Sequence, residues 1–68
     1  MTIKTYDYIN GLGRAKRLEV NMNKTEDGKY WNVIWDMKTG EFCGDATSTA
    51  EELNELLNHY GLEFVEAE

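Results

Sequence analysis

Residues 30–37 read YWNVIWDM and show the strongest strand pattern in the chain. Successive side chains of a strand point to opposite sides of a sheet, so odd- and even-numbered residues form two separate sets. Every odd-numbered residue from Trp31 to Met37 is apolar, whereas the even-numbered set from Tyr30 to Asp36 is mixed. The pattern predicts that the odd-numbered set faces the core and that the other face is mostly solvated.

Two neighbouring stretches complete an antiparallel sheet. Residues 18–23, LEVNMN, alternate apolar and polar side chains and are followed by a polar segment with the turn signal Asp27-Gly28. A second tight turn over residues 38–41 leads to a short strand over residues 41–45. The sequence therefore predicts three consecutive antiparallel strands joined by tight turns.

The last third predicts a helix over residues 49–60, with an apolar stripe at helical spacing. Ser48 is expected to cap its first turn, with Glu51 completing a capping box. Gly61 is expected to end the helix in a left-handed conformation, so that Leu62 folds back onto the last turn. The predicted fold is one α+β domain over residues 1–68, with a three-stranded antiparallel sheet and one C-terminal helix on one face. The expected core is Val20, Trp31, Val33, Trp35, Phe42, Leu53, Leu56 and Leu57.

Two segments leave the secondary structure open. Within the first 17 residues, Tyr6, Ile9 and Leu12 are spaced for a short helix, although Gly11 and Gly13 would weaken it, and a short helix or an irregular turn is favoured. The alternative is a strand over residues 3–8 followed by a loop. Residues 62–65 are expected to form a short terminal strand.

The residue types argue against catalysis, cofactors and metals. Cys43 and His59 are the only cysteine and histidine, so an internal disulfide cannot form and a four-ligand zinc site would need further ligands. The Gly11-Leu12-Gly13 fragment lacks the third glycine of a dinucleotide fingerprint, because residue 16 is lysine. We expect no catalytic residue, no cofactor and no metal site.

Targeting and membrane segments are not predicted. The N-terminus lacks the apolar core of a signal peptide, and no stretch approaches the roughly 20 apolar residues of a membrane span. One unpaired thiol fits a reducing compartment, so a cytoplasmic location without membrane contact is expected.

The charge distribution suggests a partner. The net charge is −6, and residues 39–68 contain eight acidic residues and no lysine or arginine. This balance disfavours binding to a phosphate backbone and favours a protein partner with a basic surface. The predicted contact residues are five acids, with two apolar anchors on the expected outer sheet face: Glu41, Asp45, Glu51, Glu52, Glu55, Tyr30 and Ile34.

Three alternatives are compatible with the same charge and strand pattern. The acids could serve solubility alone, or the domain could be a self-associating module that forms a homodimer through its sheet edge or the Tyr30 face. A weak nucleic-acid-binding role is the third alternative, for which Arg14, Lys16 and Arg17 form the basic cluster.

Two resemblances bear on these alternatives. The order of elements over residues 18–60 resembles βββα modules, including double-stranded-RNA-binding and integrase arm-type DNA-binding domains. Those modules place basic residues at the helix start, where this chain has Ser48, Thr49, Glu51 and Glu52. In size, acidity and lack of catalytic groups the chain resembles small inhibitor proteins encoded by phages and mobile elements. That resemblance implies an inhibitor of a nucleic-acid-handling protein, such as a CRISPR effector.

Overall fold

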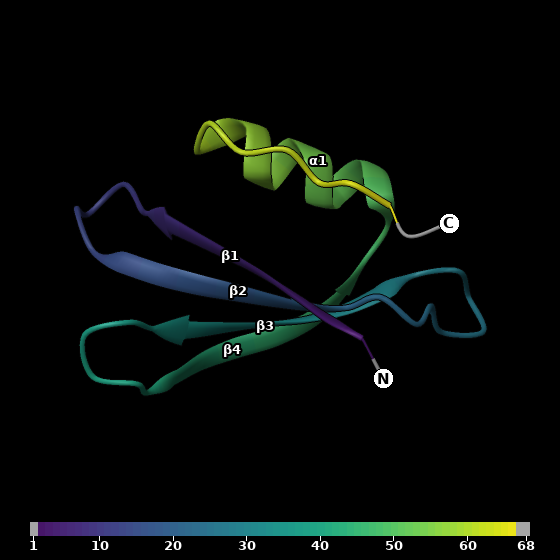
Figure 1. Cartoon of the computed structure of the whole chain (residues 1–68), viewed down its shortest axis with the longest axis horizontal. Helices are drawn as coiled ribbons and strands as arrows, with labels where there is room; N and C mark the ends of the chain where they lie inside the picture. The colour runs from purple at the N-terminus through teal and green to yellow at the C-terminus, as the bar shows by residue number, and fades with distance from the viewer. Residues whose placement is uncertain (1, 67–68) are drawn as a thin grey trace.

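The computed structural model describes residues 2–66 and contains a four-stranded antiparallel sheet with one helix. The strands follow one another across the sheet in chain order, β1-β2-β3-β4, and α1 follows the last strand (Figure 1). The elements are β1 (Ile3–Ile9), β2 (Ala15–Asn21), β3 (Tyr30–Asp36), β4 (Phe42–Ser48) and α1 (Ala50–His59). The predicted α+β class with a C-terminal helix is therefore confirmed, with four strands instead of three.

The additional strand is β1, so the favoured N-terminal helix or irregular turn is wrong and the alternative, a strand over residues 3–8, is right to within one residue. All seven residues of β1 pair with β2, from Ile3 opposite Asn21 to Ile9 opposite Ala15. The two strands are joined by a turn in which Asn10 Oδ1 accepts hydrogen bonds from the backbone N–H groups of Leu12 and Arg14. Pairing with β2 satisfies the backbone groups of β1 that point toward that strand, which outweighs the weak helical spacing.

The register between β2 and β3 determines which side of the sheet is buried. Leu18 lies opposite Ile34, and Val20 lies opposite Asn32. Residues directly opposite each other in an antiparallel pair point to the same face. Leu18 and Val20, both fully buried, therefore share a face with the even-numbered residues of β3. We call this the helix face, because α1 packs on it, and we call the opposite side the outer face.

The predicted core orientation of β3 is wrong. Tyr30 is 1 % exposed in the helix-face core, whereas Trp31 is 46 % exposed on the outer face. The physical reason is the parity of the register, since a slip of one residue exchanges the two faces of a strand. Of the eight expected core residues, Val20, Leu53 and Leu57 are buried and Leu56 packs against the core. The four others belong to the outer face: Trp31, Val33, Trp35 and Phe42.

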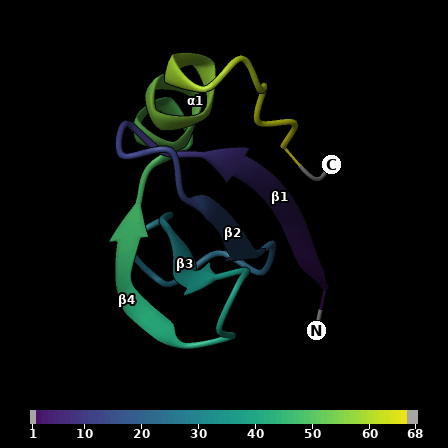
Figure 2. The ribbon, with the colours of Figure 1, turned by 90° about the vertical axis from the view of Figure 1, so that its left-hand side faces the viewer.

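The buried asparagine on β3 explains how a mixed set of residues can form the core. Asn32 is 4 % exposed, and its Nδ2 group donates to Ser48 Oγ at 2.9 Å and to the Tyr30 carbonyl at 3.3 Å. A buried amide costs little when its hydrogen bonds are made inside the protein. Figure 2 shows α1 on one side of the curved sheet, and the opposite side of the described chain carries no further element.

The ends of α1 follow from local sequence signals. The N-cap is Thr49 and the capping box closes with Glu52, so the predicted Ser48–Glu51 box is displaced by one residue. Ser48 is instead the last residue of β4 and accepts the hydrogen bond from Asn32. At the other end, the Leu62 N–H donates to the Leu57 carbonyl at 2.8 Å, which confirms the predicted fold-back after Gly61.

Residues 62–65 do not form the predicted terminal strand. They extend along the core, where Phe64 is 4 % exposed and its ring lies 5.1 Å from the Tyr30 ring. The Phe64 N–H donates to Asn54 Oδ1 on α1 instead of to a neighbouring strand. Phe64 thus fills the space between β1, β3 and the helix with a side chain that the sequence pattern did not place in the core.

The capping box makes a first stability prediction. Thr49→Ala removes the hydroxyl that accepts the Glu52 N–H, and we expect a loss of about 1 kcal/mol in the free energy of unfolding. Thr49→Ser keeps an acceptor at the same position and should stay within about 0.5 kcal/mol of the wild type. Urea unfolding followed by circular dichroism measures both variants. Equal stabilities of the alanine and serine variants would contradict the capping role.

Candidate protein-binding surface

The two predicted apolar anchors do not form a surface. Tyr30 is buried in the core, and Ile34 is partly buried against it on the helix face. The expectation that both residues stand on an exposed sheet face is wrong for the same reason as the core prediction, because the faces of β3 are exchanged. Tyr30 is therefore not available to a partner in the folded domain, and Ile34 lies on the helix face instead of the outer face.

Of the three glutamates of α1, one caps the helix and the other two face solvent. Glu52 accepts the Thr49 N–H at 2.9 Å, and hydrogen bonding with Thr49 lowers the pKa of this carboxyl. Glu51 and Glu55 are exposed. Because α1 covers the helix face, these glutamates lie on the side of the molecule away from the outer face.

Glu41 and Asp45 lie apart from the helix glutamates. Glu41 precedes β4 at the end of the strand remote from α1 (Figure 1). Asp45 lies opposite Val33 on the outer face, and its Oδ2 accepts the Trp31 Nε1–H at 3.0 Å. The structure therefore does not gather the five predicted carboxylates into one patch, and Asp45 alone among them contacts the aromatic residues of the outer face.

The outer face carries a stripe of large apolar side chains along β3 and its neighbours. Trp31 and Phe42 are 46 % and 58 % exposed, and Met37, just beyond β3, is also exposed. A β-bulge between β3 and β4 places Phe42 opposite Trp35, where the two ring centroids are 5.7 Å apart in an edge-to-face arrangement. A contiguous apolar surface of this kind is typical of interaction sites. We call Trp31, Val33, Trp35, Met37 and Phe42 the aromatic stripe.

Polar side chains from β1 and β2 border the aromatic stripe. Arg17 Nε donates to Asp7 Oδ1 at 2.8 Å, and this pairing lowers the pKa of the Asp7 carboxyl. Glu19 lies opposite Val33 in the middle of the stripe. Among residues 2–66, no hydrogen bond or ion pair engages the Glu19 carboxylate. In this border the charges of Arg17 and Asp7 neutralise each other, whereas the charge of Glu19 is not paired within the described residues.

Two hollows flank Trp35 on the outer face. One has a volume of about 120 Å³ and is lined by Ile3, Glu19, Asn21, Trp31, Val33 and Trp35. The other has a volume of about 350 Å³ and is lined by Arg17, Glu19, Trp35, Asp36, Met37 and Gly40. The Trp35 Nε1–H is buried and has no hydrogen-bond partner in the described chain.

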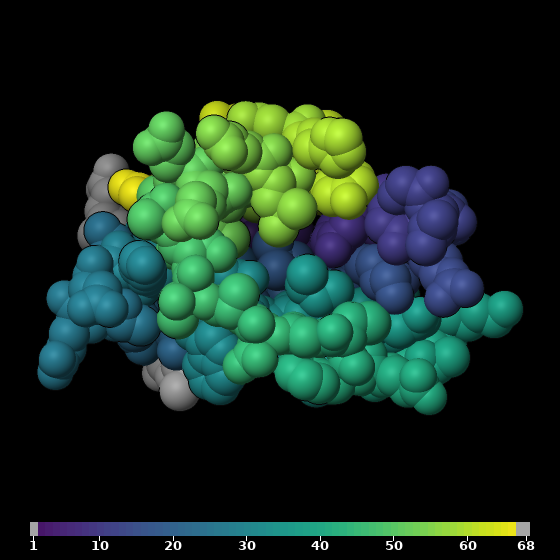
Figure 3. All heavy atoms as spheres, turned by 180° about the vertical axis from the view of Figure 1, so that it is seen from behind, coloured from purple at the N-terminus to yellow at the C-terminus, as the bar shows by residue number. Residues whose placement is uncertain are grey.

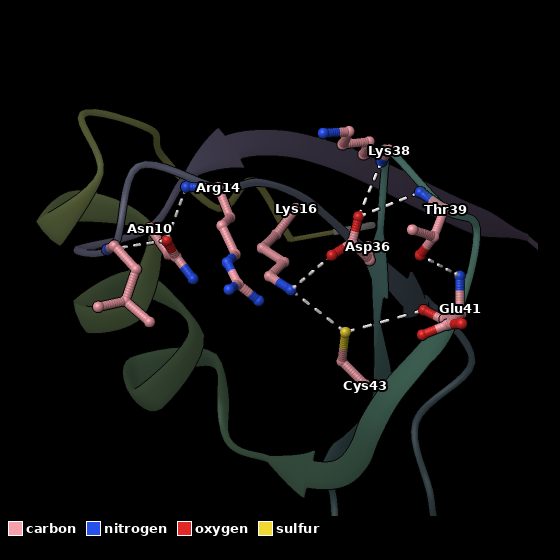
Figure 4. Close-up of polar contacts among 9 residues, drawn as sticks. Asn10, Arg14, Lys16, Asp36, Lys38, Thr39, Glu41 and Cys43 are labelled. Carbon is pink, nitrogen blue, oxygen red and sulfur yellow. Dashed lines mark hydrogen bonds and ion pairs between the residues drawn. The ribbon is translucent and has the colours of Figure 1, made fainter.

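The cysteine and its neighbours occupy the other side of the sheet, near the β3–β4 turn. Figure 4 shows Lys16 Nζ between Asp36 Oδ2, at 3.2 Å, and Cys43 Sγ, at 3.4 Å. The helix does not cover this part of the sheet completely. In Figure 3, atoms of β1 and β2 are visible between α1 and the β3–β4 segment. None of the hydrogen bonds in residues 2–66 joins Cys43 to His59, whose ring contacts Tyr60.

Two members of the basic cluster, Lys16 and Arg17, are divided between the faces. Lys16 points to the helix face, where it pairs with Asp36, and Arg17 points to the outer face, where it pairs with Asp7. Adjacent strand residues face opposite sides of a sheet, so these two cannot present their charges together. Both charges are already compensated by carboxylates within the domain.

Asp36 gives a prediction for the pH dependence of stability. The backbone N–H groups of Lys38 and Thr39 donate to its Oδ1 and lower the pKa of this carboxyl, with a further contribution from Lys16. The unfolded carboxyl, with an ordinary pKa of about 3.9, then binds a proton more readily than the folded one. The stabilisation is fully present above that value and is lost as the pH falls through the folded pKa.

The matched variants are Asp36→Asn and Glu63→Gln, which each remove one carboxylate. We expect Asp36→Asn to lower the melting temperature at pH 7 and to make its decline between pH 5 and pH 3 shallower than in the wild type. Glu63 is exposed, and Glu63→Gln should leave both properties close to the wild type. Thermal unfolding followed by circular dichroism gives the profiles. If the melting temperatures of all three proteins declined in parallel with falling pH, the stabilising role of the Asp36 carboxylate would be contradicted.

Neither a metal centre nor a membrane-spanning helix occurs in the described part of the chain. Within residues 2–66, no three side chains among His, Cys, Asp and Glu gather closely enough to hold a metal ion. In that range, α1 is too short and too polar to cross a bilayer. Comparison with protein-family models, curated proteins and solved structures gives no match. The case for a function therefore depends on the outer face itself.

Proposed function

We propose that this domain is a protein-binding module that engages its partner with the outer face of the sheet. The observation that carries the proposal is the aromatic stripe, where Trp31 on β3 and Phe42 on β4 are each about half exposed. Large aromatic side chains are enriched at protein interfaces, where they dominate the binding energy. Their exposure in so small a domain is costly for solubility, and a partner that covers them accounts for it.

The charge around the stripe supports a basic partner. The outer face carries Asp7, Glu19 and Asp45 against Arg17, which is three negative charges and one positive, or −2. The rest of the chain adds to this, since the net charge is −6. A negative field increases association rates with a positively charged surface and disfavours a nucleic-acid backbone. Two copies of this face would bring like charges together, so a second copy is a poorer occupant.

The kind of partner follows from the same charge. Proteins that handle nucleic acids present basic surfaces to phosphate groups. A small acidic domain that docks on such a surface with an aromatic centre would block access to it. We therefore propose an inhibitory role toward a nucleic-acid-handling protein, with the exposed Glu51 and Glu55 adding to the long-range attraction rather than forming the contact.

Site-specific photo-crosslinking in a cell lysate tests which face meets the partner. A benzophenone amino acid replaces Thr47, an exposed outer-face residue opposite Trp31, in one protein and Glu55 on α1 in a matched control. We expect a defined basic protein to be crosslinked from position 47 and not from position 55, with a yield that falls as salt is raised. Crosslinking from position 55 alone, or capture of a second copy of this chain from position 47, would overturn the proposal.

A further inference from the structure

The smaller hollow of the outer face has the shape and chemistry of a site for one cationic side chain. Trp31 and Trp35 both line it, and Val33 lies between them on β3. Glu19 stands opposite Val33 on the neighbouring strand and also lines the hollow. A volume of about 120 Å³ accommodates a side-chain head group but not a folded element.

The walls of the hollow are held in place before any ligand arrives. Trp31 is oriented by the bond from its Nε1–H to Asp45 on β4. Trp35 is oriented by its edge-to-face contact with Phe42, also on β4. Fixing a binding group in advance reduces the conformational entropy that is lost when the ligand binds. The indole faces therefore meet a ligand without rearrangement, unlike flexible side chains on a loop.

The charge of the hollow is unbalanced in favour of a cation. Glu19 makes no hydrogen bond or ion pair within the described chain; Arg17 attracts it only at longer range, because both carboxylate oxygens of Asp7 already bind that guanidinium. Indole faces attract cations through their quadrupole, and the attraction grows when the cation loses water. The same hollow is thus lined by two indoles and by a residue with an unpaired carboxylate.

We infer that this hollow binds an arginine side chain of the partner protein, packed against the indoles of Trp31 and Trp35 with Glu19 as its counter-charge. This inference rests on the proposed function and specifies its central contact. Arginine fits better than lysine because its guanidinium is planar, stacks on aromatic rings and is more weakly hydrated than an ammonium group. The fork of N–H donors can also bind the Glu19 carboxylate in bidentate fashion.

A titration with defined peptides tests the inference. The probe is a blocked five-residue peptide, acetyl-Thr-Val-Arg-Val-Thr-amide, with citrulline or lysine in place of arginine in the two control peptides. Nitrogen-15 NMR follows the indole Nε1–H signals, of which the protein has two because it contains two tryptophans. We expect the arginine peptide to shift both signals and to bind about fivefold more tightly than the citrulline peptide.

The matched protein variants are Glu19→Gln and Glu55→Gln. Each removes one negative charge with little change in shape, and Glu55 lies on α1 away from the outer face. Glu19→Gln should weaken arginine-peptide binding about fivefold, whereas Glu55→Gln, which removes only long-range attraction, should stay within about 1.5-fold of the wild type. Equal affinity for the arginine and citrulline peptides, equal affinity for arginine and lysine, or no effect of Glu19→Gln would each overturn the inference.

The two proposals can fail separately. If crosslinking from position 47 succeeds but neither the peptide nor the partner responds to Glu19→Gln, the outer face is the docking surface and the arginine site is wrong. If the arginine peptide shifts both indole signals but no partner is crosslinked from position 47, the side-chain site stands and the proposed docking function is wrong. Concentration-dependent self-association that protects the same two indoles would overturn the arginine site in favour of a second copy.

Discussion

Tyr30→Ala is expected to remove a large part of the free energy of unfolding, whereas the neighbouring change Trp31→Ala removes little of it. Tyr30 is 1 % exposed, and its ring packs against Phe64 in the core. Removing a buried aromatic side chain costs about 3–5 kcal/mol. A domain of 68 residues has a total stability of about 3–10 kcal/mol, so the loss is a large part of the whole.

Trp31→Ala removes a side chain that is 46 % exposed together with its bond to Asp45. We expect a cost of about 1 kcal/mol, because little core volume is lost. Tyr30→Phe is the control for the first variant, since it keeps the buried ring, and it should stay close to the wild type. Urea unfolding and amide NMR spectra measure all three proteins. A cost for Trp31→Ala equal to that of Tyr30→Ala would show that the faces of β3 have been assigned the wrong way round.

The second large effect concerns binding. The double variant Trp31→Ala/Phe42→Ala removes the two most exposed aromatic side chains of the stripe, and we expect it to weaken binding of the crosslinked partner by about 30-fold or more. The reason is that buried aromatic anchors supply most of the binding energy of an interface. Isothermal titration calorimetry with the purified partner measures the change.

A matched control comes from two exposed apolar residues elsewhere in the chain. Leu12, in the β1–β2 turn, is 80 % exposed, and Val65, after α1, is 57 % exposed. Leu12→Ala/Val65→Ala removes a similar kind of surface outside the aromatic stripe, and it should bind within about twofold of the wild type. Both double variants should retain the circular dichroism spectrum of the folded domain. An equal loss of binding in the two double variants would contradict a specific role for the outer face.

Local signals in the sequence were enough to predict the elements around β3 and α1. The alternation of residues 18–23, the Asp27-Gly28 turn and the Gly61 stop all act within a few residues of where they stand. Gly28 and Gly61 have positive φ angles of 76° and 77°, as turn and helix-end positions require. The strand, the turn and the helix end could therefore be located before any tertiary contact was known.

The face of β3 that would be buried could not be predicted in this way. It depends on whether Leu18 and Val20 pair with even- or odd-numbered residues of β3, and a change of one residue in the connecting turn reverses the answer. The odd-numbered set of β3 is more apolar, so hydrophobicity alone chooses the wrong side. Burial of Asn32 becomes acceptable only because Ser48, 16 residues later, accepts its hydrogen bond.

The candidate site was missed for the same reason. Once Trp31 and Trp35 were assigned to the core, the acidic residues of the C-terminal half were the strongest remaining surface feature. The polar residues of β2 at positions 17, 19 and 21 carried a usable signal, because they mark the side of that strand that faces away from the core. β1 was not predicted because the apolar residues of this segment are spaced as in a helix. Its strand conformation depends on pairing with β2, which the segment's own sequence does not show.

The central claim is that α1 covers the Tyr30 face of the sheet and leaves the Trp31–Trp35 face open to a partner. A nuclear Overhauser spectrum of the unbound protein tests it directly. We predict cross-peaks between the rings of Tyr8 and Tyr60, whose centroids are 4.4 Å apart, and between those of Tyr30 and Phe64, at 5.1 Å. Cross-peaks from the Leu53 and Leu57 methyl groups to the indole rings of Trp31 and Trp35 would contradict it.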